Sequence, residues 1–149
     1  MNSHPYLRAF LAGVFVPTLI LPVLLCVFIV VRLVFQVPYP IERGLVFPMA
    51  LVPALWGVWN MLWVWSRSTT NFPLAAHGAI LPLLIMPAGT VIARYLGVVE
   101  FTAGGATKFG HFHVPYALVA IFFCVAVSAY YLIWKYIVGF VNRTLGITL

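Results

Sequence analysis

The chain has 149 residues, of which 64% are hydrophobic and 7% are charged, and its formal net charge is +6. A soluble domain carries about a quarter charged residues, so this composition excludes a water-covered surface and predicts an integral membrane protein. The basic charge requires no nucleic acid as a partner, because Lys and Arg at helix ends meet anionic lipid headgroups.

Four apolar runs are each long enough to cross a bilayer, which takes about 20 helical residues. They cover residues 9–35, 45–65, 74–96 and 114–137, and short connections join them. We therefore predict an all-α integral membrane protein with one domain, residues 1–149, built as a bundle of four transmembrane helices. An even number of spans places the N- and C-termini on the same side of the membrane.

Pairs of prolines five residues apart mark the first three spans. A proline removes one backbone donor and clashes with the carbonyl one turn earlier, so we expect these three helices to be kinked. In a membrane such helices are tolerated where neighbouring helices satisfy the freed carbonyls. The pairs are Pro17 and Pro22, Pro48 and Pro53, and Pro82 and Pro87.

The distribution of basic residues predicts the orientation. On the side of the termini lie four basic residues and no acid: Arg8, Arg67, Lys135 and Arg143. On the other side, once Arg32 and Arg94 are assigned to the ends of spans, the loops hold two basic residues. Because Lys and Arg are enriched in cytoplasmic loops, we predict cytoplasmic termini and place the protein in a bacterial inner membrane.

Charged side chains gather on the side opposite the termini, and they are candidates for binding an anionic ligand. Arg32 and Arg94 end the first and third spans there, while Arg43 and Glu100 come from the loops. Arginine offers forked donors to a phosphate or carboxylate. The alternative is that each arginine extends to the headgroups and that Glu100 pairs with a nearby cation.

Two histidines, His111 and His113, suggest a metal site. In an extended segment residues two apart point the same way, so both imidazoles could bind one ion with Glu100 as a third ligand. In a helix they would diverge, and they would then contact water or headgroups instead. A haem needs axial ligands at matching depth, and His77 could supply one only across a dimer.

The second span carries a tryptophan stripe, and Asn60 lies beside it. Trp56 and Asn60 are deep enough to line a binding surface for a flat or isoprenoid ligand, whereas tryptophans nearer Arg67 fit an interfacial aromatic belt. Packing against another helix is the alternative for Trp56 and Asn60. In either case an amide at that depth requires a hydrogen bond.

The fourth span repeats small residues at helical spacing. Ala117, Ala120, Cys124 and Ser128 would let another backbone approach closely, which favours helix association in lipid. The partner is the first span or a second copy of the chain. Four spans bury little internal surface, so we expect a homo-oligomer or a subunit of a larger membrane complex.

These features lead to a functional hypothesis. The chain has no phosphate-binding loop, nucleophile elbow or paired metal motif. We expect a non-enzymatic membrane protein that self-associates and binds a lipid-like or anionic ligand between kinked helices. One alternative is a haem- or metal-binding membrane subunit of a redox or transport complex. Another is a small membrane enzyme that acts on a lipid.

Overall fold

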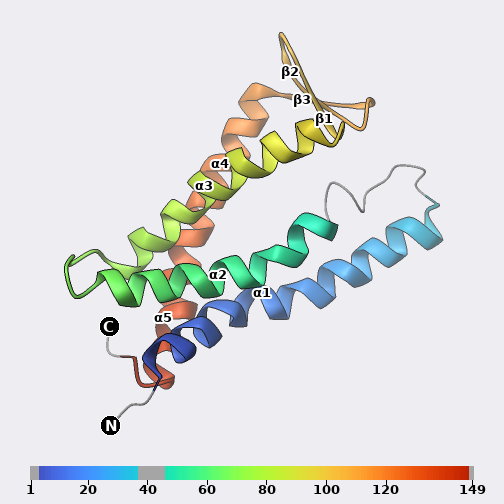
Figure 1. Ribbon diagram of the computed structural model, residues 1–149. Helices are drawn as coiled ribbons and strands as arrows, with labels where there is room; N and C mark the ends of the chain where they lie inside the picture. Colours follow the sequence, from blue (N-terminus) through green and yellow to red (C-terminus); the bar gives the residue numbers. More distant parts are fainter. Residues whose placement is uncertain (1–3, 37–45, 148–149) are drawn as a thin grey trace.

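The computed structural model describes residues 4–36 and 46–147, apart from the side chains of Phe47 and Pro48. This part of the chain is mostly helical (Figure 1). Its elements in chain order are α1 (Pro5–Ile29), the π-helical turn η1 (Val30–Val34), α2 (Phe47–Ser66), α3 (Leu74–Tyr95), β1 (Val99–Thr102), β2 (Gly105–Lys108), β3 (Phe112–Pro115), α4 (Tyr116–Ile133), the π-helical turn η3 (Trp134–Val138) and α5 (Gly139–Thr144).

Within the described ranges, three helical stretches are long and apolar enough to cross a membrane. They are Pro5–Val34, Leu74–Tyr95 and Tyr116–Thr144. This confirms the prediction of a mostly helical chain with helices of membrane-spanning length and composition. The remaining helix, α2, covers most of the second predicted span but is not among the three.

One connection departs from the all-helical expectation. Strands β1, β2 and β3 form an antiparallel sheet in the segment that we expected to be a loop, with Val99 opposite Lys108 and Thr107 opposite His113. Val98, Val99 and Ala106 are buried against Ala93 at the end of α3, so the sheet caps that helix. Each strand has four residues, which is too short for alternation to predict a sheet.

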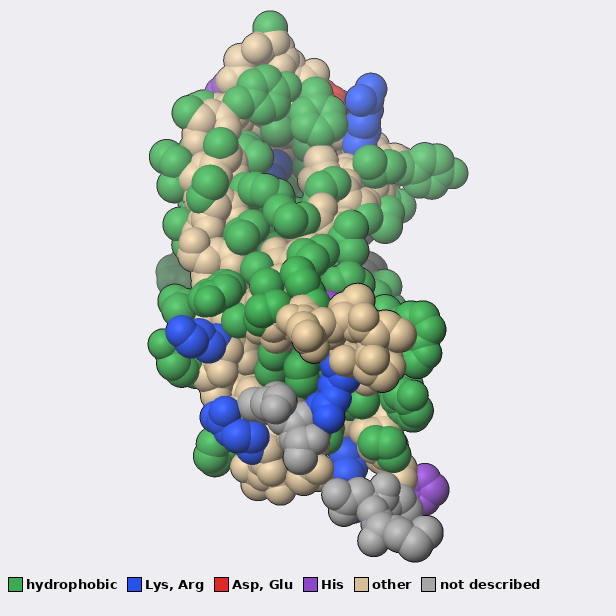
Figure 2. Space-filling view, turned by 90° about the vertical axis from the view of Figure 1, so that its left-hand side faces the viewer, with side chains coloured by type: hydrophobic (Ala, Val, Ile, Leu, Met, Phe, Trp, Pro, Cys, Tyr) green, Lys and Arg blue, Asp and Glu red, His purple; other side chains and the backbone are tan. Residues whose placement is uncertain are grey.

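The helices form two arms that meet at one end. We call α1 with α2 the first arm and α3 with α4 the second arm; the helices of each arm pack on each other. The arms meet where α1 begins and α5 ends, here called the terminal end, and they diverge toward the far end (Figure 1). Lys and Arg side chains gather at the terminal end, below a broad hydrophobic surface (Figure 2).

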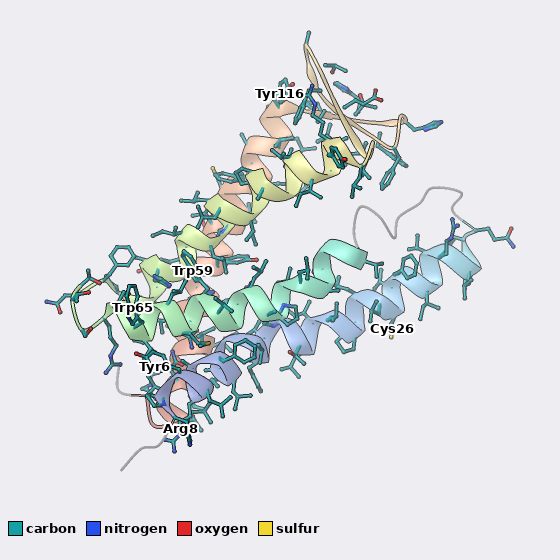
Figure 3. All side chains as sticks on the ribbon, in the orientation of Figure 1. Tyr6, Arg8, Cys26, Trp59, Trp65 and Tyr116 are labelled. Atoms are coloured by element: carbon teal, nitrogen blue, oxygen red, sulfur yellow. The ribbon has the colours of Figure 1, made fainter. Side chains whose placement is uncertain are left out.

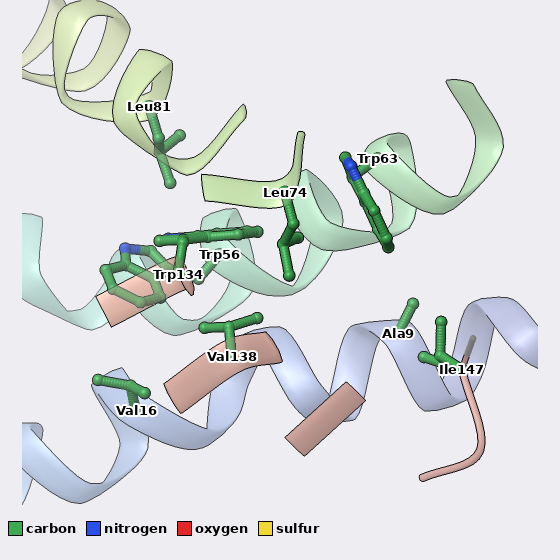
Figure 4. Packing of buried hydrophobic residues seen from close by; sticks show 9 residues of the cluster. All are labelled: Ala9, Val16, Trp56, Trp63, Leu74, Leu81, Trp134, Val138 and Ile147. Atoms are coloured by element: carbon green, nitrogen blue, oxygen red, sulfur yellow. The ribbon is translucent and has the colours of Figure 1, made fainter. Parts of the chain in front are cut away.

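Apart from the small cluster under the sheet, the buried core lies in the terminal half of the molecule. Its members come from α1, α2, α3 and the segment after α4: Ala9, Val16, Trp56, Trp63, Leu74, Leu81, Trp134, Val138 and Ile147 (Figure 4). In the described chain the last buried residue of α1 is Pro17, and that of α3 is Pro82. Helix α4 has no buried residue before η3. The arms therefore leave the core at two of the prolines that the sequence singles out.

Glycines allow the helices to approach closely in this core. A Cβ on Gly13 would overlap the backbone carbonyl of Trp56, and one on Gly57 would overlap the ring of Phe10. A Cβ on Gly78 would overlap the side chain of Trp134. Because lipid provides no hydrophobic drive between helices, close backbone contact of this kind supplies much of their attraction.

Replacement of Gly13 tests this contact. We expect Gly13→Ala to lower the stability by about 1–3 kcal/mol, because the obstructing atoms belong to backbone and have no rotamer that relieves the overlap. The matched control is Gly89→Ala in α3, where a Cβ meets nothing within 4 Å. Thermal unfolding in detergent, followed by tryptophan fluorescence, compares the two variants. Equal stability of both would contradict the close contact of α1 with α2.

Candidate functional site

The polar centre of the molecule is a pair of buried amides. Asn60 in α2 and Asn142 in α5 are both 0% exposed. Nδ2 of Asn60 donates to Oδ1 of Asn142 at 2.8 Å and to the carbonyl of Ala9 at 2.8 Å. Nδ2 of Asn142 donates back to Oδ1 of Asn60 at 3.2 Å. The pair therefore joins α1, α2 and α5 through three hydrogen bonds, and Asn60 has the partner that its depth requires.

An aromatic cluster lies beside the amides. The ring centroid of Trp56 is 4.8 Å from that of Tyr130 and 5.6 Å from that of Trp134. Nε1 of Trp56 donates to the hydroxyl of Tyr130 at 3.3 Å. Tyr130, Trp134, Val138 and Asn142 follow one another at four-residue intervals. The π-helical turn η3 holds more residues per turn than an α-helix, so these side chains keep to the same side.

The two arms are joined by a reciprocal contact of His77 with Trp59, the residue that Figure 3 labels on α2. Nε1 of Trp59 donates to the carbonyl of His77 at 2.8 Å, and Nε2 of His77 lies 3.0 Å from the carbonyl of Trp59. A carbonyl only accepts, so Nε2 of His77 is the donor in this contact. The two rings also stack, with centroids 4.5 Å apart. His77 thus acts as a structural link between α2 and α3.

The structure separates the residues that we expected to bind an anion. Arg32 is half-buried in η1, and Arg94 is exposed near the end of α3 with its guanidinium 5.6 Å from the ring centroid of Phe101. These helix ends belong to different arms and lie apart (Figure 1). Glu100 is exposed on β1. Arg43 lies outside the described residues.

The histidines of the metal hypothesis occupy the sheet. His113 is on β3, which is extended as that hypothesis requires, and His111 precedes the strand with its Nδ1 2.7 Å from the carbonyl of Phe109. Glu100 and His113 both stand opposite Thr107, so they share one face of the sheet. Across the described ranges, no three His, Cys, Asp or Glu side chains are grouped as metal ligands.

The small-residue face of α4 points away from the chain's own core. Ala117, Ala120, Cys124 and Ser128 are all exposed. The hydroxyl of Ser128 donates to the carbonyl of Cys124 at 2.9 Å, within its own helix. The first span therefore does not cover this face, and a second copy or another partner stays the prediction for it.

The sequence did not predict that four residues belong to this site. Asn142, Trp134 and Tyr130 belong to the last helical stretch, and His77 was considered only as a haem ligand. One signal was available for Asn142, because the predicted need of Asn60 for a partner pointed to another deep polar side chain. The predicted fourth span ended at residue 137, five residues too early to include Asn142.

Comparison with family models, with curated proteins and with solved structures found no match to this chain. Its function is therefore argued from the arrangement of its own residues. That arrangement consists of a buried amide pair with an aromatic cluster at the terminal end, and of two arms in whose far halves no described helix residue is buried.

The amide pair provides a direct test of this centre. We expect Asn60→Ala to lower the free energy of unfolding by about 1–2 kcal/mol, because it leaves the amide of Asn142 buried without its partner. Asn142→Ala should cost a similar amount, and the double variant less than the sum. Exposed Asn71→Ala is the control. Additive losses in a double-mutant cycle of unfolding would show that the two amides are not coupled.

Proposed function

We propose that this chain is a non-catalytic integral membrane protein that binds a lipid-like ligand between its two arms and associates with further copies of itself. The observation that carries the proposal is that the larger core, which joins the two arms, lies in their terminal halves. Beyond Pro17 and Pro82 the arms diverge with apolar side chains uncovered, among them Leu19, Val23, Leu84 and Val91.

The exposed area is large for a chain of this mass. The chain exposes 9572 Å², whereas a compact soluble monomer of the same mass exposes about 7,600 Å². Many large apolar side chains are exposed on the helices, and such a surface suits an acyl or isoprenoid chain. The lipid-like form of the ligand is better supported than the anionic form, because Arg32 and Arg94 lie on separate arms.

Self-association is proposed for the uncovered face of α4. Its small residues permit close helix packing, and α4 buries no residue within its own chain. A second copy packed on this face would leave the space between the arms of each copy available to ligand.

Native mass spectrometry of gently extracted protein tests ligand binding and self-association together. We expect an oligomer that carries one defined apolar adduct per chain. The adduct should be retained in the double variant Arg32→Ala with Arg94→Ala, as in the control Arg67→Ala with Arg143→Ala, whose arginines lie at the opposite end.

Loss of the adduct in the first double variant alone would favour the anionic form of the ligand. Bare monomers of the native protein, extracted in several mild detergents, would overturn the proposal.

The membrane arrangement is part of the same proposal. We propose that α2 is the fourth span, so that the four helices cross in alternation and both termini are cytoplasmic in a bacterial inner membrane. Arg8, Arg67, Lys135 and Arg143 then lie on the cytoplasmic side, which agrees with the enrichment of basic residues there.

Cysteine labelling in intact cells checks this arrangement. In a Cys26→Ala, Cys124→Ala background, we expect an impermeant maleimide to label Phe35→Cys and Thr107→Cys without permeabilisation. Thr69→Cys, in the connection between α2 and α3, should be labelled only after permeabilisation. Labelling of all three variants in intact cells would show that α2 and α3 do not cross the membrane.

A further inference from the structure

The sheet has an apolar face and a polar face. Residues opposite each other in the antiparallel register share a face, and so do residues two apart along a strand. The apolar face carries Val99, Phe101, Ala106, Lys108, Phe112 and Val114. The polar face carries Glu100, Thr102, Gly105, Thr107, His113 and Pro115. The register therefore separates the large apolar side chains of the strands from the carboxylate, the hydroxyls and the imidazole.

The apolar face is turned toward the helices. Val99 and Ala106 are buried, and Ala93 of α3 packs against their cluster. Phe101 belongs to the same face, and its ring centroid lies 5.6 Å from the guanidinium of Arg94 in α3. Because the two faces of a sheet are opposite, the polar face points away from the end of α3.

Part of the apolar face stays exposed although it is turned toward the helices. Phe101 is 45% exposed and Phe112 is 53% exposed. Tyr95 and Leu96, where α3 ends, are exposed as well. Exposed apolar surface of this kind marks contact with another protein or with lipid. The position of the sheet and its charges decide between the two.

The sheet is attached to two helices that are long and apolar enough to cross the membrane, α3 and α4. It begins at Val99, shortly after α3 ends at Tyr95, and it ends directly before α4 begins at Tyr116 (Figures 1 and 3). The 22 residues of α3 measure about 33 Å, and the hydrocarbon core measures about 30 Å, so a helix of this length that crosses it ends at the headgroups. Tyrosine is enriched at that level. A sheet attached there lies at the membrane surface.

The charges beside the apolar face fit lipid headgroups. Arg94 at the end of α3 and Lys108 on the apolar face are both exposed, and Glu100 stands on the polar face. Long basic side chains keep their stems in apolar surroundings while they reach phosphates. A second copy docked face to face would instead bring the same cations against each other, and such contacts between like charges are unfavourable.

We propose that the apolar face of the sheet docks on the lipid surface. Phe101 and Phe112 then lie at the boundary between headgroups and acyl chains, and Arg94 and Lys108 lie at the phosphates. The polar face is in water. The hydroxyl of Tyr116 donates to the carbonyl of Thr102 at 2.9 Å, so the docked sheet anchors the start of α4 together with the end of α3. This docking depends neither on the ligand nor on the self-association proposed above.

Spin labels compare the two faces in vesicles of phosphatidylcholine and phosphatidylglycerol. In full-length protein without native cysteines, the label is attached at Phe101→Cys or Phe112→Cys on the apolar face. His113→Cys, next in the chain but on the polar face, is the matched control, and Val91→Cys on the exposed side of α3 gives the lipid reference. Electron paramagnetic resonance measures collisions with oxygen, which concentrates in lipid, and with a water-soluble nickel chelate. We expect a ratio of oxygen to nickel collisions several-fold higher at Phe101 and Phe112 than at His113.

Equal ratios on the two faces would overturn the docking, because both faces would then have the same surroundings. Labels at Phe101 and Phe112 that are shielded from both reagents would also overturn it, and would show that protein covers this face. If a cysteine disturbs the sheet, Phe112→Trp keeps an aromatic ring there. Its quenching by brominated lipid, measured as the excess over wild-type protein and compared with His113→Trp, then gives the same comparison.

Discussion

The rest of the structure depends on the reciprocal amide pair of Asn60 and Asn142. In lipid no water is present to form hydrogen bonds with an unpaired amide. Each of these side chains therefore fixes the position of the other. Asn60 also holds the carbonyl of Ala9, while the carbonyl of Asn142 accepts the N–H of Ile147 and Arg8 donates to the carbonyl of Leu145. These bonds close the terminal end around the last helix. Because that helix continues from α4 through η3, the amide pair also holds the second arm against the first.

Packing around the pair follows from the small size of a few residues. Gly13 and Gly57 let α1 and α2 meet at backbone distance, and Gly78 receives the indole of Trp134. In lipid the gain comes from these dispersion contacts and not from removal of apolar surface from water. The contacts therefore persist only where side chains interlock closely. Beyond the last interlocked residues, Pro17 and Pro82, nothing described holds the arms together, and they diverge.

The sequence predicted the class of protein better than the site. Composition and the lengths of apolar runs determine where a chain must be helical and surrounded by lipid, so the helices of α1, α3 and α4 were foreseeable. The depth of Asn60 showed that it needed a partner. The sequence did not identify Asn142 as this partner. The position of Asn142 depends on the π-helical turn η3, and the 3.6-residue period of an α-helix does not predict such a turn. The sheet of β1, β2 and β3 was missed because four-residue strands leave no pattern long enough to distinguish from a loop.

Two prolines lie at the boundary between the packed terminal half of the molecule and the far halves of the arms. Pro17 and Pro82 have no N–H, so the carbonyls of Gly13 and Gly78 lack their usual helical partners at the boundary of the core. Gly13 and Gly78 are also the points of closest packing. At this level each helix therefore lacks one backbone hydrogen bond and is held by close packing against its neighbour. The two prolines thus mark the boundary between the terminal end, which the pair of Asn60 and Asn142 holds together, and the diverging halves of the arms.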